Sequence, residues 1–344
     1  MARTIKIEES KDCLKSYVQS GNLNFLIGSG ASYPAIKLAG NIETEINGLL
    51  SDGKENEADL LCLDFIENLE SENDIISLGL QTDDTKTTLE YYTEFLKVID
   101  HILFERKNLL LPRQANIFTT NYDTFVEHAG SELPSIIVND GFDKASSLNG
   151  YYNFAPEQFS DRIYRSGSVY RRQAEVPSIN LIKIHGSLTW LKGKNDIKYN
   201  AATSKKLSDQ QRKDPEEVAK SLKKRGLILP NLKKFNSTLT DRTYYDLLRV
   251  FANSMEVENS VLIAFGFSFA DEHIRDIIKR SLRNPTSQLI IFAYKQADVE
   301  NFETLFSAHR NVIIVAPKDS EQTGFKEFTA LLETISPKIE AIHE

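Results

Sequence analysis

Cysteine is nearly absent from this sequence, in which Cys13 and Cys62 are the two cysteines among 344 residues. Two thiols cannot provide the four thiolates of a structural zinc site, and they do not form the disulfide framework of a small secreted domain. We therefore expect a protein of the reducing cytoplasm that holds no metal.

Long apolar runs are missing as well. The longest lies near residues 261–270, and it has about half of the roughly 20 residues that a membrane-spanning helix needs. The chain starts with charged side chains and has no apolar signal core there. The sequence thus predicts neither a membrane segment nor secretion.

An excess of positive charge is also lacking, because the net charge is −8. This balance argues against a nucleic-acid-binding surface that covers the whole domain. Arginines interleaved with tyrosines between residues 162 and 172 are an alternative site, since such mixtures grip single-stranded nucleic acid. Given the acidic total, we favour a solvated rim or a subunit contact there. The arginines concerned are Arg162, Arg165, Arg171 and Arg172.

The sequence does contain a pattern that predicts strands alternating with helices. In the last third, apolar runs at 261–267, 288–293 and 312–315 are each followed by a helical pattern. This alternation predicts an α/β fold with a Rossmann-like, doubly wound, mainly parallel sheet. We assign residues 1–344 to a single domain. Its Rossmann-like core comprises about residues 20–45, 114–145, 178–192 and 226–344.

Residues 46–113 differ in character, because no strand pattern occurs in them. Apolar side chains recur at helical spacing over 60–69 and 89–104, with Thr87 or Thr88 placed to cap the second helix. We predict a helical insertion that packs on the core or forms an oligomer contact. Two further excursions are expected, an aromatic and basic one over about 146–177 and an exposed, charged one over about 193–225.

Polar clusters follow four of the predicted strands. In parallel sheets ligands bind beyond the carboxyl ends of the strands, and glycines at a turn let backbone N–H groups approach a phosphate. Each cluster also has a plain structural explanation, such as a helix cap, a core histidine or a glycine that relieves crowding. Together they predict one ligand pocket with a few placed polar groups. They are Gly28-Ser29-Gly30-Ala31-Ser32, Thr119-Thr120-Asn121-Tyr122-Asp123, His185-Gly186-Ser187 and Gly266-Phe267-Ser268.

The order of these clusters resembles the sirtuin superfamily. The forms Phe-Thr-Thr-Asn-Tyr-Asp, Lys-Ile-His-Gly-Ser-Leu-Thr-Trp and Gly-Phe-Ser-Phe-Ala-Asp resemble the bacterial sirtuin-like branch linked to antiphage defence. The resemblance implies that the pocket binds NAD. It implies that the backbone of Gly28, Ser29, Gly30 and Ala31 holds the NAD phosphates, with Ser32 nearby. Further binding residues implied in this way are Thr120, Tyr122, Gly266 and Ser268.

The same resemblance implies three catalytic residues. Asn121 would position an attacking water, Asp123 would contact the nicotinamide carboxamide, and His185 would act as a base. These residue types suit the chemistry, because an amide holds a water without ionising and an imidazole titrates near neutrality.

Two departures from the superfamily limit the reactions that we expect of this protein. Protein-deacylating sirtuins typically carry two Cys-x-x-Cys pairs for zinc, which this sequence lacks, and Tyr33-Pro34-Ala35-Ile36 replaces their Asp-Phe-Arg element. Without an acyl-lysine groove, water is the expected nucleophile, so we predict an NAD+ hydrolase that releases nicotinamide and ADP-ribose. The alternatives are a zinc-less protein deacylase and a non-catalytic NAD-binding subunit of a larger defence complex.

A hydrolase that depletes NAD in an infected cell has to be restrained, so we expect a homo-oligomer or a regulatory partner. In related two-gene systems the partner is a HerA-type ATPase. The resemblance implies that such an ATPase would be supplied in trans, because this sequence has no Gly-x-x-x-x-Gly-Lys-Ser/Thr loop.

Overall fold

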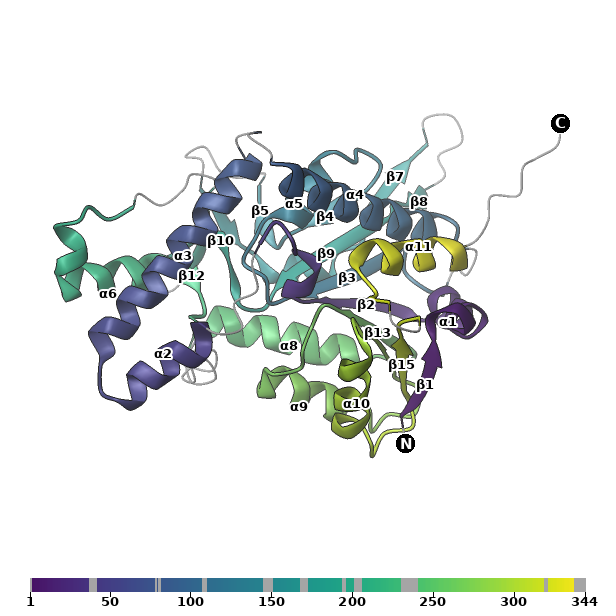
Figure 1. The fold of residues 1–344 in the computed structure, drawn as a ribbon. Coiled ribbons are helices and arrows are strands. Elements are labelled where there is room, and N and C mark those ends of the chain that lie inside the picture. Colours follow the sequence, from purple (N-terminus) through teal and green to yellow (C-terminus); the bar gives the residue numbers. More distant parts are fainter. Residues whose placement is uncertain are drawn as a thin grey trace.

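An eight-stranded sheet, in which each neighbouring pair is parallel, forms the centre of the protein (Figure 1). The structure is a computed structural model that describes residues 2–36, 42–77, 79, 82–106, 110–144, 151–167, 173–193, 196–200, 206–229, 241–318 and 321–336. The predicted Rossmann-like, mainly parallel sheet is thereby confirmed. In spatial order its strands are β1 (Arg3–Lys6), β15 (Val312–Ala316), β14 (Gln288–Phe292), β13 (Ser260–Phe265), β2 (Asn22–Ile27), β3 (Gln114–Thr119), β9 (Ser178–Lys183) and β4 (Ile137–Asn139).

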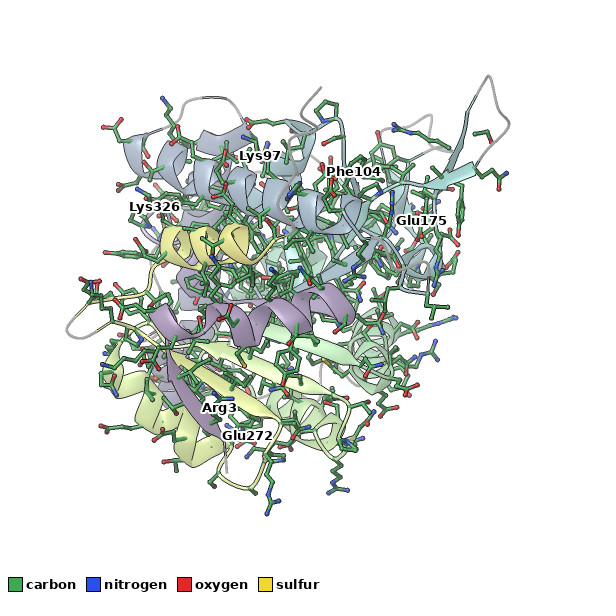
Figure 2. The ribbon with its side chains drawn as sticks, turned by 90° about the vertical axis from the view of Figure 1, so that its right-hand side faces the viewer. Arg3, Lys97, Phe104, Glu175, Glu272 and Lys326 are labelled. Carbon is green, nitrogen blue, oxygen red and sulfur yellow. The ribbon has the colours of Figure 1, made fainter. Side chains whose placement is uncertain are left out.

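Helices cover both faces of this sheet because successive side chains of a strand point to opposite faces. Phe25 and Ile27 of β2 belong to one hydrophobic core and Leu26 belongs to the other. One face carries α1 (Lys11–Ser20), α4 (Asp83–Phe104), α5 (Phe125–Ser131) and α11 (Phe325–Ile335), and the other carries α8 (Arg242–Glu256), α9 (Glu272–Ser281) and α10 (Gln296–Leu305). Figure 2 shows the layers from the side, with Lys326 of α11 above the strands and Glu272 of α9 below them.

The direction of the chain reverses at β2. From β2 the chain continues to β3 on one side, whereas β13 is added later on the other side. Ligands of open parallel sheets bind in the crevice at such a switch point, outside the carboxyl ends of the strands. The carboxyl ends of β2, β3, β9 and β13 all lie at this edge, since these strands are parallel.

Long helices lie between β2 and β3 along the chain. They are α2 (Ile42–Ser51), α3 (Glu55–Ser77) and α4. The predicted N-cap at Thr87 or Thr88 is wrong, because α4 begins earlier and the hydroxyl of Thr82 accepts a hydrogen bond from the Thr85 amide. The first turns of α4 are polar, so the apolar pattern of the helix does not show where the helix begins. Helix α4 packs against α5, α11 and β3, so it lies directly on the sheet.

A second, antiparallel sheet stands beyond the carboxyl end of β9. Its strands are β12 (Arg225–Leu227), β10 (Gly186–Lys192), β11 (Ile197–Tyr199), β6 (Tyr152–Phe154) and β5 (Phe142–Asp143). Ile197 is buried, and helix α6 (Pro215–Lys224) turns Val218 and Leu222 inward. The charged segment 193–225, expected to be exposed, is therefore partly built into the protein. The short strands of this segment cannot be predicted from the sequence, because three residues are too few to show a periodic apolar pattern.

A small hairpin, β7 (Tyr164–Ser166) with β8 (Gln173–Glu175), carries part of the basic and aromatic segment. Arg162 and Arg165 are exposed, whereas Arg171 and Arg172 lie outside the described residues. No helix in the described ranges combines the length and the apolarity that crossing a bilayer requires.

Asparagine side chains form a ladder across the middle of the sheet. The Asn116 amide donates to Asn24 Oδ1 (2.7 Å), and the Asn180 amide donates to Asn116 Oδ1 (2.9 Å). Asn139 extends the ladder by donating to Asn180 (3.1 Å). These residues are directly paired across β2, β3, β9 and β4. A shift of one residue would separate every pair, so the ladder specifies the register.

We expect Asn116→Ala to lower the free energy of unfolding by about 2 kcal/mol, because the buried Asn24 Oδ1 loses its donor and the Asn180 side-chain amide keeps only its hydrogen bond to Phe159 O. Urea denaturation measures this change. Asn301→Ala is the matched control, because Asn301 is exposed on α10. Equal stability of the two variants would show that the ladder does not stabilise the sheet.

Candidate functional site

Four residues from two distant motifs meet at the carboxyl ends of β2 and β3. The side-chain amide of Asn121 donates to Gly28 O (3.1 Å) and to Ser32 Oγ (3.1 Å). Ser32 Oγ in turn donates to Asp123 Oδ2 (2.8 Å). All four residues are buried. We call Gly28, Ser32, Asn121 and Asp123 the Asn121 cluster.

The backbone around the Asn121 cluster is held by side chains on both sides. Thr119 Oγ1 donates to Ile27 O (2.7 Å) and accepts from the backbone N–H of Asn121 (3.0 Å). These two hydrogen bonds join the ends of β2 and β3. Asn73 of α3 accepts from the amide (3.0 Å) and the hydroxyl (2.7 Å) of Thr124. The start of α5, and with it Asp123, is thereby positioned by the long helices.

Tyr92 of α4 is a member of the site that sequence reasoning missed. Its hydroxyl lies 2.9 Å from Ser32 Oγ. The single proton of the Ser32 hydroxyl goes to Asp123, so Tyr92 is the donor in this pair. Burial raises the pKa of Tyr92 well above its usual value, which keeps that proton in place. A tyrosine on the apolar stripe of a helix looks like an ordinary core residue, so no sequence signal distinguished it.

Replacing Tyr92 by phenylalanine is expected to cost about 1 kcal/mol of stability, because the buried Ser32 oxygen loses a donor. Denaturant unfolding checks this, with Tyr91→Phe as the matched variant on the same helix. Tyr91 is only half-buried. A larger loss in Tyr91→Phe than in Tyr92→Phe would contradict the assigned hydrogen bond.

Lys183, the last residue of β9, is the second missed member. It is buried, and its ammonium donates to the carbonyl of Asp123 and to Ser187 Oγ (3.1 Å). It also pairs with Glu127 of α5 (2.8 Å). Burial raises the pKa of the Glu127 carboxyl, and the neighbouring Lys183 opposes that rise. The sequence signal was a lysine inside the apolar run Leu-Ile-Lys-Ile.

The glycines of two motifs touch each other. A Cβ on Gly28 would lie 2.3 Å from Gly266 O, and a Cβ on Gly266 would lie 2.7 Å from the Ala31 amide nitrogen. Gly266 also has φ of +65°, which disfavours other residues. The loops that follow β2 and β13 therefore pack backbone against backbone at the switch point, and only glycine permits this approach.

The turn after β2 is closed by internal hydrogen bonds. The amides of Gly28, Gly30, Ala31 and Ser32 all donate to carbonyl oxygens of the chain itself. A phosphate bound by these amides would have to replace those bonds. The phosphate-binding role implied for them stays a prediction.

His185 follows β9 at the same edge. The register pairs Thr119 with Lys183, so Asn121 and His185 stand at equivalent positions past two neighbouring strands. His185 is buried, and its carbonyl accepts from the Ile228 amide (2.9 Å). Its ring lies against His273 of α9, with 3.4 Å between the two Nε2 atoms.

The remaining predicted binding residues lie around this group. Tyr122 points toward the second sheet, where its hydroxyl donates to Ile228 O (2.6 Å). Ser29 and Ser268 are exposed, and Thr120 is half-buried. Ser268 Oγ accepts from the Ala270 amide within its own loop (3.4 Å).

One buried atom of the Asn121 cluster has no partner. Within the part of the chain that the structure describes, Asn121 Oδ1 is buried and accepts no hydrogen bond. Buried acceptors are nearly always paired with protein or water. Asn121 Oδ1 is therefore an atom at which a bound water or ligand can donate.

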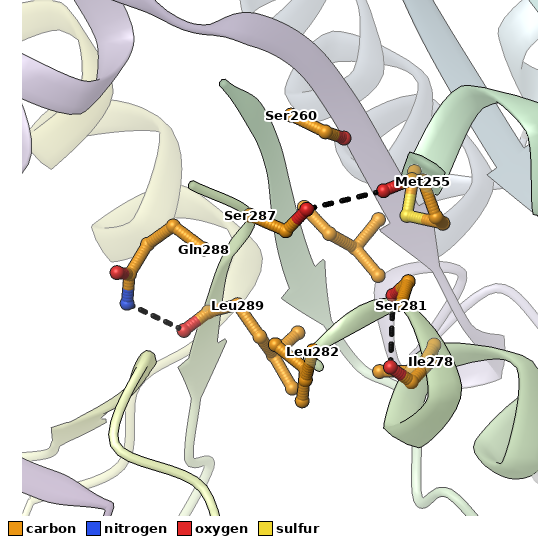
Figure 3. A pocket seen from close by; sticks show the side chains of 9 residues that line it. Met255, Ser260, Ile278, Ser281, Leu282, Ser287, Gln288 and Leu289 are labelled. Carbon is orange, nitrogen blue, oxygen red and sulfur yellow. Dashed lines mark hydrogen bonds between the residues drawn. The ribbon is translucent and has the colours of Figure 1, made fainter. Parts of the chain in front are cut away.

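A separate void lies between α8, α9, β13 and β14 (Figure 3). Its volume is about 10 Å³, and Met255, Ile278 and Leu282 line it together with Ser260 and Gln288 at the amino ends of the strands. It has room for about one water molecule, and it lies at the opposite edge from the Asn121 cluster. It is a packing defect and no binding site.

A family model described as a SIR2-like domain matches residues 115–314. The matched range runs from β3 to β15 and includes Asn121, Asp123, His185 and Gly266. The comparison with curated proteins gave no match.

Proposed function

Because the chain belongs to the SIR2-like family, whose domains bind NAD, we propose that it is an NAD+ hydrolase. NAD+ would bind at the edge formed by the carboxyl ends of β2, β3, β9 and β13. Water would attack the ribose carbon that carries nicotinamide. The new bond joins this carbon to the water oxygen, the bond to nicotinamide breaks, and the products are ADP-ribose, nicotinamide and one proton.

The observation that carries this proposal is the unpartnered Oδ1 of Asn121 inside a cluster whose other atoms are paired. A water that donates one proton to this oxygen has its lone pairs free to attack. The amide NH2 is anchored on Gly28 and Ser32, so the side chain has a single orientation. Such preorganisation reduces the entropy cost of placing the nucleophile.

Two further residues fit the charge changes of the reaction. Positive charge develops on the ribose carbon as nicotinamide leaves, and the buried Asp123 carboxylate stabilises it. The proton released by water needs an acceptor, which the His185 imidazole supplies. Lys183 holds the carbonyl of Asp123 and so positions this loop.

The test is direct. The purified chain incubated with NAD+ is expected to release nicotinamide and ADP-ribose in equal amounts, measured by chromatography, and His185→Ala is expected to abolish the release. His101→Ala is the control, since His101 lies in the last turn of α4. Release that depends on an acylated peptide would favour a deacylase, and NAD+ binding without turnover would favour a non-catalytic subunit.

We further propose that NAD depletion serves antiphage defence in the cytoplasm and that a homo-oligomer or a HerA-type ATPase supplied in trans restrains it. Support for this part is the resemblance of the motifs alone. Light scattering gives the mass of the purified protein. NAD levels in infected cells that express the wild type or His185→Ala test the role: equal levels would contradict it.

A further inference from the structure

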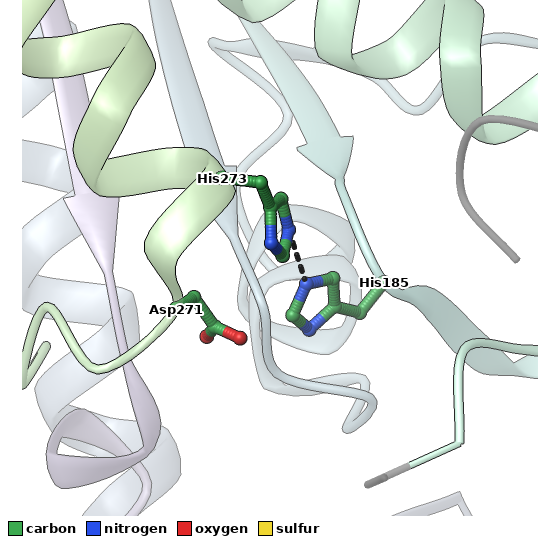
Figure 4. A group of neighbouring side chains, drawn as sticks. All are labelled: His185, Asp271 and His273. Carbon is green, nitrogen blue, oxygen red and sulfur yellow. Dashed lines mark hydrogen bonds between the residues drawn. The ribbon is translucent and has the colours of Figure 1, made fainter. Parts of the chain in front are cut away.

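A second group of ligand-type atoms surrounds His185. Asp271 and His273, at the start of α9, approach it from the opposite side of the switch point (Figure 4). One nitrogen or oxygen atom from each of the three residues lies within 4.8 Å of the others. We call His185, Asp271 and His273 the His185 cluster.

The spacing of the two imidazoles suits a metal ion. Their Nε2 atoms are 3.4 Å apart and share a long hydrogen bond, which a metal ion bound by both rings would replace (Figure 4). Two nitrogens at ~2.0–2.1 Å from one tetrahedral zinc ion lie about 3.3–3.4 Å from each other. The separation of the two nitrogens therefore matches that of two ligands of a single ion.

The backbone that carries these three residues is held in place. His185 is followed by Gly186, which has φ of +87°. A Cβ added to Gly186 would lie 2.0 Å from Gly226 O, so the backbone is tightly packed at this position. Asp271 is the N-cap residue of α9 and His273 lies in its first turn. A site on fixed elements binds without paying for its own ordering.

We propose that the His185 cluster binds one divalent transition-metal ion, with zinc the best fit to two imidazoles and one carboxylate. The carboxylate and two neutral imidazoles together carry one negative charge, which favours a divalent cation. The expectation of no metal came from the lack of thiolates. It does not apply here, because histidine and aspartate supply the ligands.

Metal in this site would restrain the enzyme, a consequence that rests on the proposed function. Coordination occupies the Nε2 lone pair of His185. The imidazole then has no lone pair at Nε2 with which to accept the proton that water releases. Zinc is therefore expected to inhibit nicotinamide release, and a chelator is expected to restore it.

The binding test uses Co2+ as a visible probe, with tag-free protein and no NAD+. The wild type is expected to bind one Co2+ per chain with the absorption of tetrahedral cobalt, and Zn2+ is expected to displace it. His273→Gln and Asp271→Asn are each expected to weaken Co2+ binding at least tenfold, since even outer-shell partners of metals contribute 10–100-fold. His101→Gln is the control. Absence of stoichiometric Co2+ binding by the wild type, or wild-type affinity for Co2+ in both variants, would overturn the proposal.

The enzyme assay separates this proposal from the hydrolase itself. Inhibition by Zn2+ is compared with the metal-free rate of each protein, and it is expected in the wild type and not in His273→Gln. One-to-one Co2+ binding without any nicotinamide release would support the metal site and refute the hydrolase. Nicotinamide release without Co2+ binding would do the reverse.

Discussion

Asn121→Ala is expected to lower the rate of NAD+ hydrolysis by about 100- to 1,000-fold, the size of loss that follows removal of one preorganised hydrogen-bonding group from an active site. The variant loses the buried Oδ1 that would hold the attacking water. Asn121→Asp is expected to be as slow, because a carboxylate cannot donate to Gly28 O and Ser32 Oγ. Nicotinamide release at saturating NAD+ measures both rates.

The control for this prediction is Asn301→Ala, an exposed asparagine on α10 that should leave the rate unchanged. NAD+ binding by calorimetry and thermal unfolding show whether the Asn121 variants are folded and still bind. A folded Asn121→Ala that keeps nicotinamide release within threefold of the wild-type rate would remove Asn121 from the mechanism.

Arg225→Met is expected to lower the free energy of unfolding by about 3–5 kcal/mol, because it leaves a buried carboxylate without its partner. Arg225 binds Glu70 of α3 through Nε (2.8 Å) and Nη2 (3.0 Å), and both side chains are 4% exposed. The pair joins the long helices to β12. Urea denaturation of the wild type and the variant measures the loss.

Two variants sharpen this test. Adding Glu70→Leu to Arg225→Met removes the unpaired charge and is expected to recover most of the loss. Lys97→Met breaks a pair with Glu94 whose side chains are 51% and 59% exposed, and it should cost less than about 1 kcal/mol. A loss below that value for Arg225→Met would show that water reaches Glu70.

The strands of the main sheet are predictable because their signal is local. β2 is buried at every position after Asn22, and Ser260–Phe265 is buried at every position. A parallel strand covered by helices on both faces is mostly apolar, so a short window of sequence suffices. Edge and short strands lack this signal. Only Ile5 is buried in β1, which is a strand because β15 offers it a free edge.

The candidate site also has a part that the sequence predicts and a part that it does not. Chain order alone indicates that residues after β2, β3, β9 and β13 meet, since parallel strands end at one edge. Glycine and asparagine are recognisable there because they occur in short motifs. Tyr92 and His273 show no such signal, because each looks like an ordinary helix residue in its own segment, and Lys183 is marked only by its place in an apolar strand.

The sequence by itself therefore determined most strands of the sheet, and that the loops carrying Asn121 and His185 each follow a strand at the edge where the carboxyl ends lie. Only the tertiary structure decided that Tyr92 donates a hydrogen bond to the Ser32 oxygen, that Lys183 holds the Asp123 loop, and that α9 brings His273 to His185. The physical reason is the separation along the chain of the residues that interact. Apolar periodicity and turns depend on residues close together in sequence, whereas a buried hydrogen bond depends on how segments distant in sequence pack.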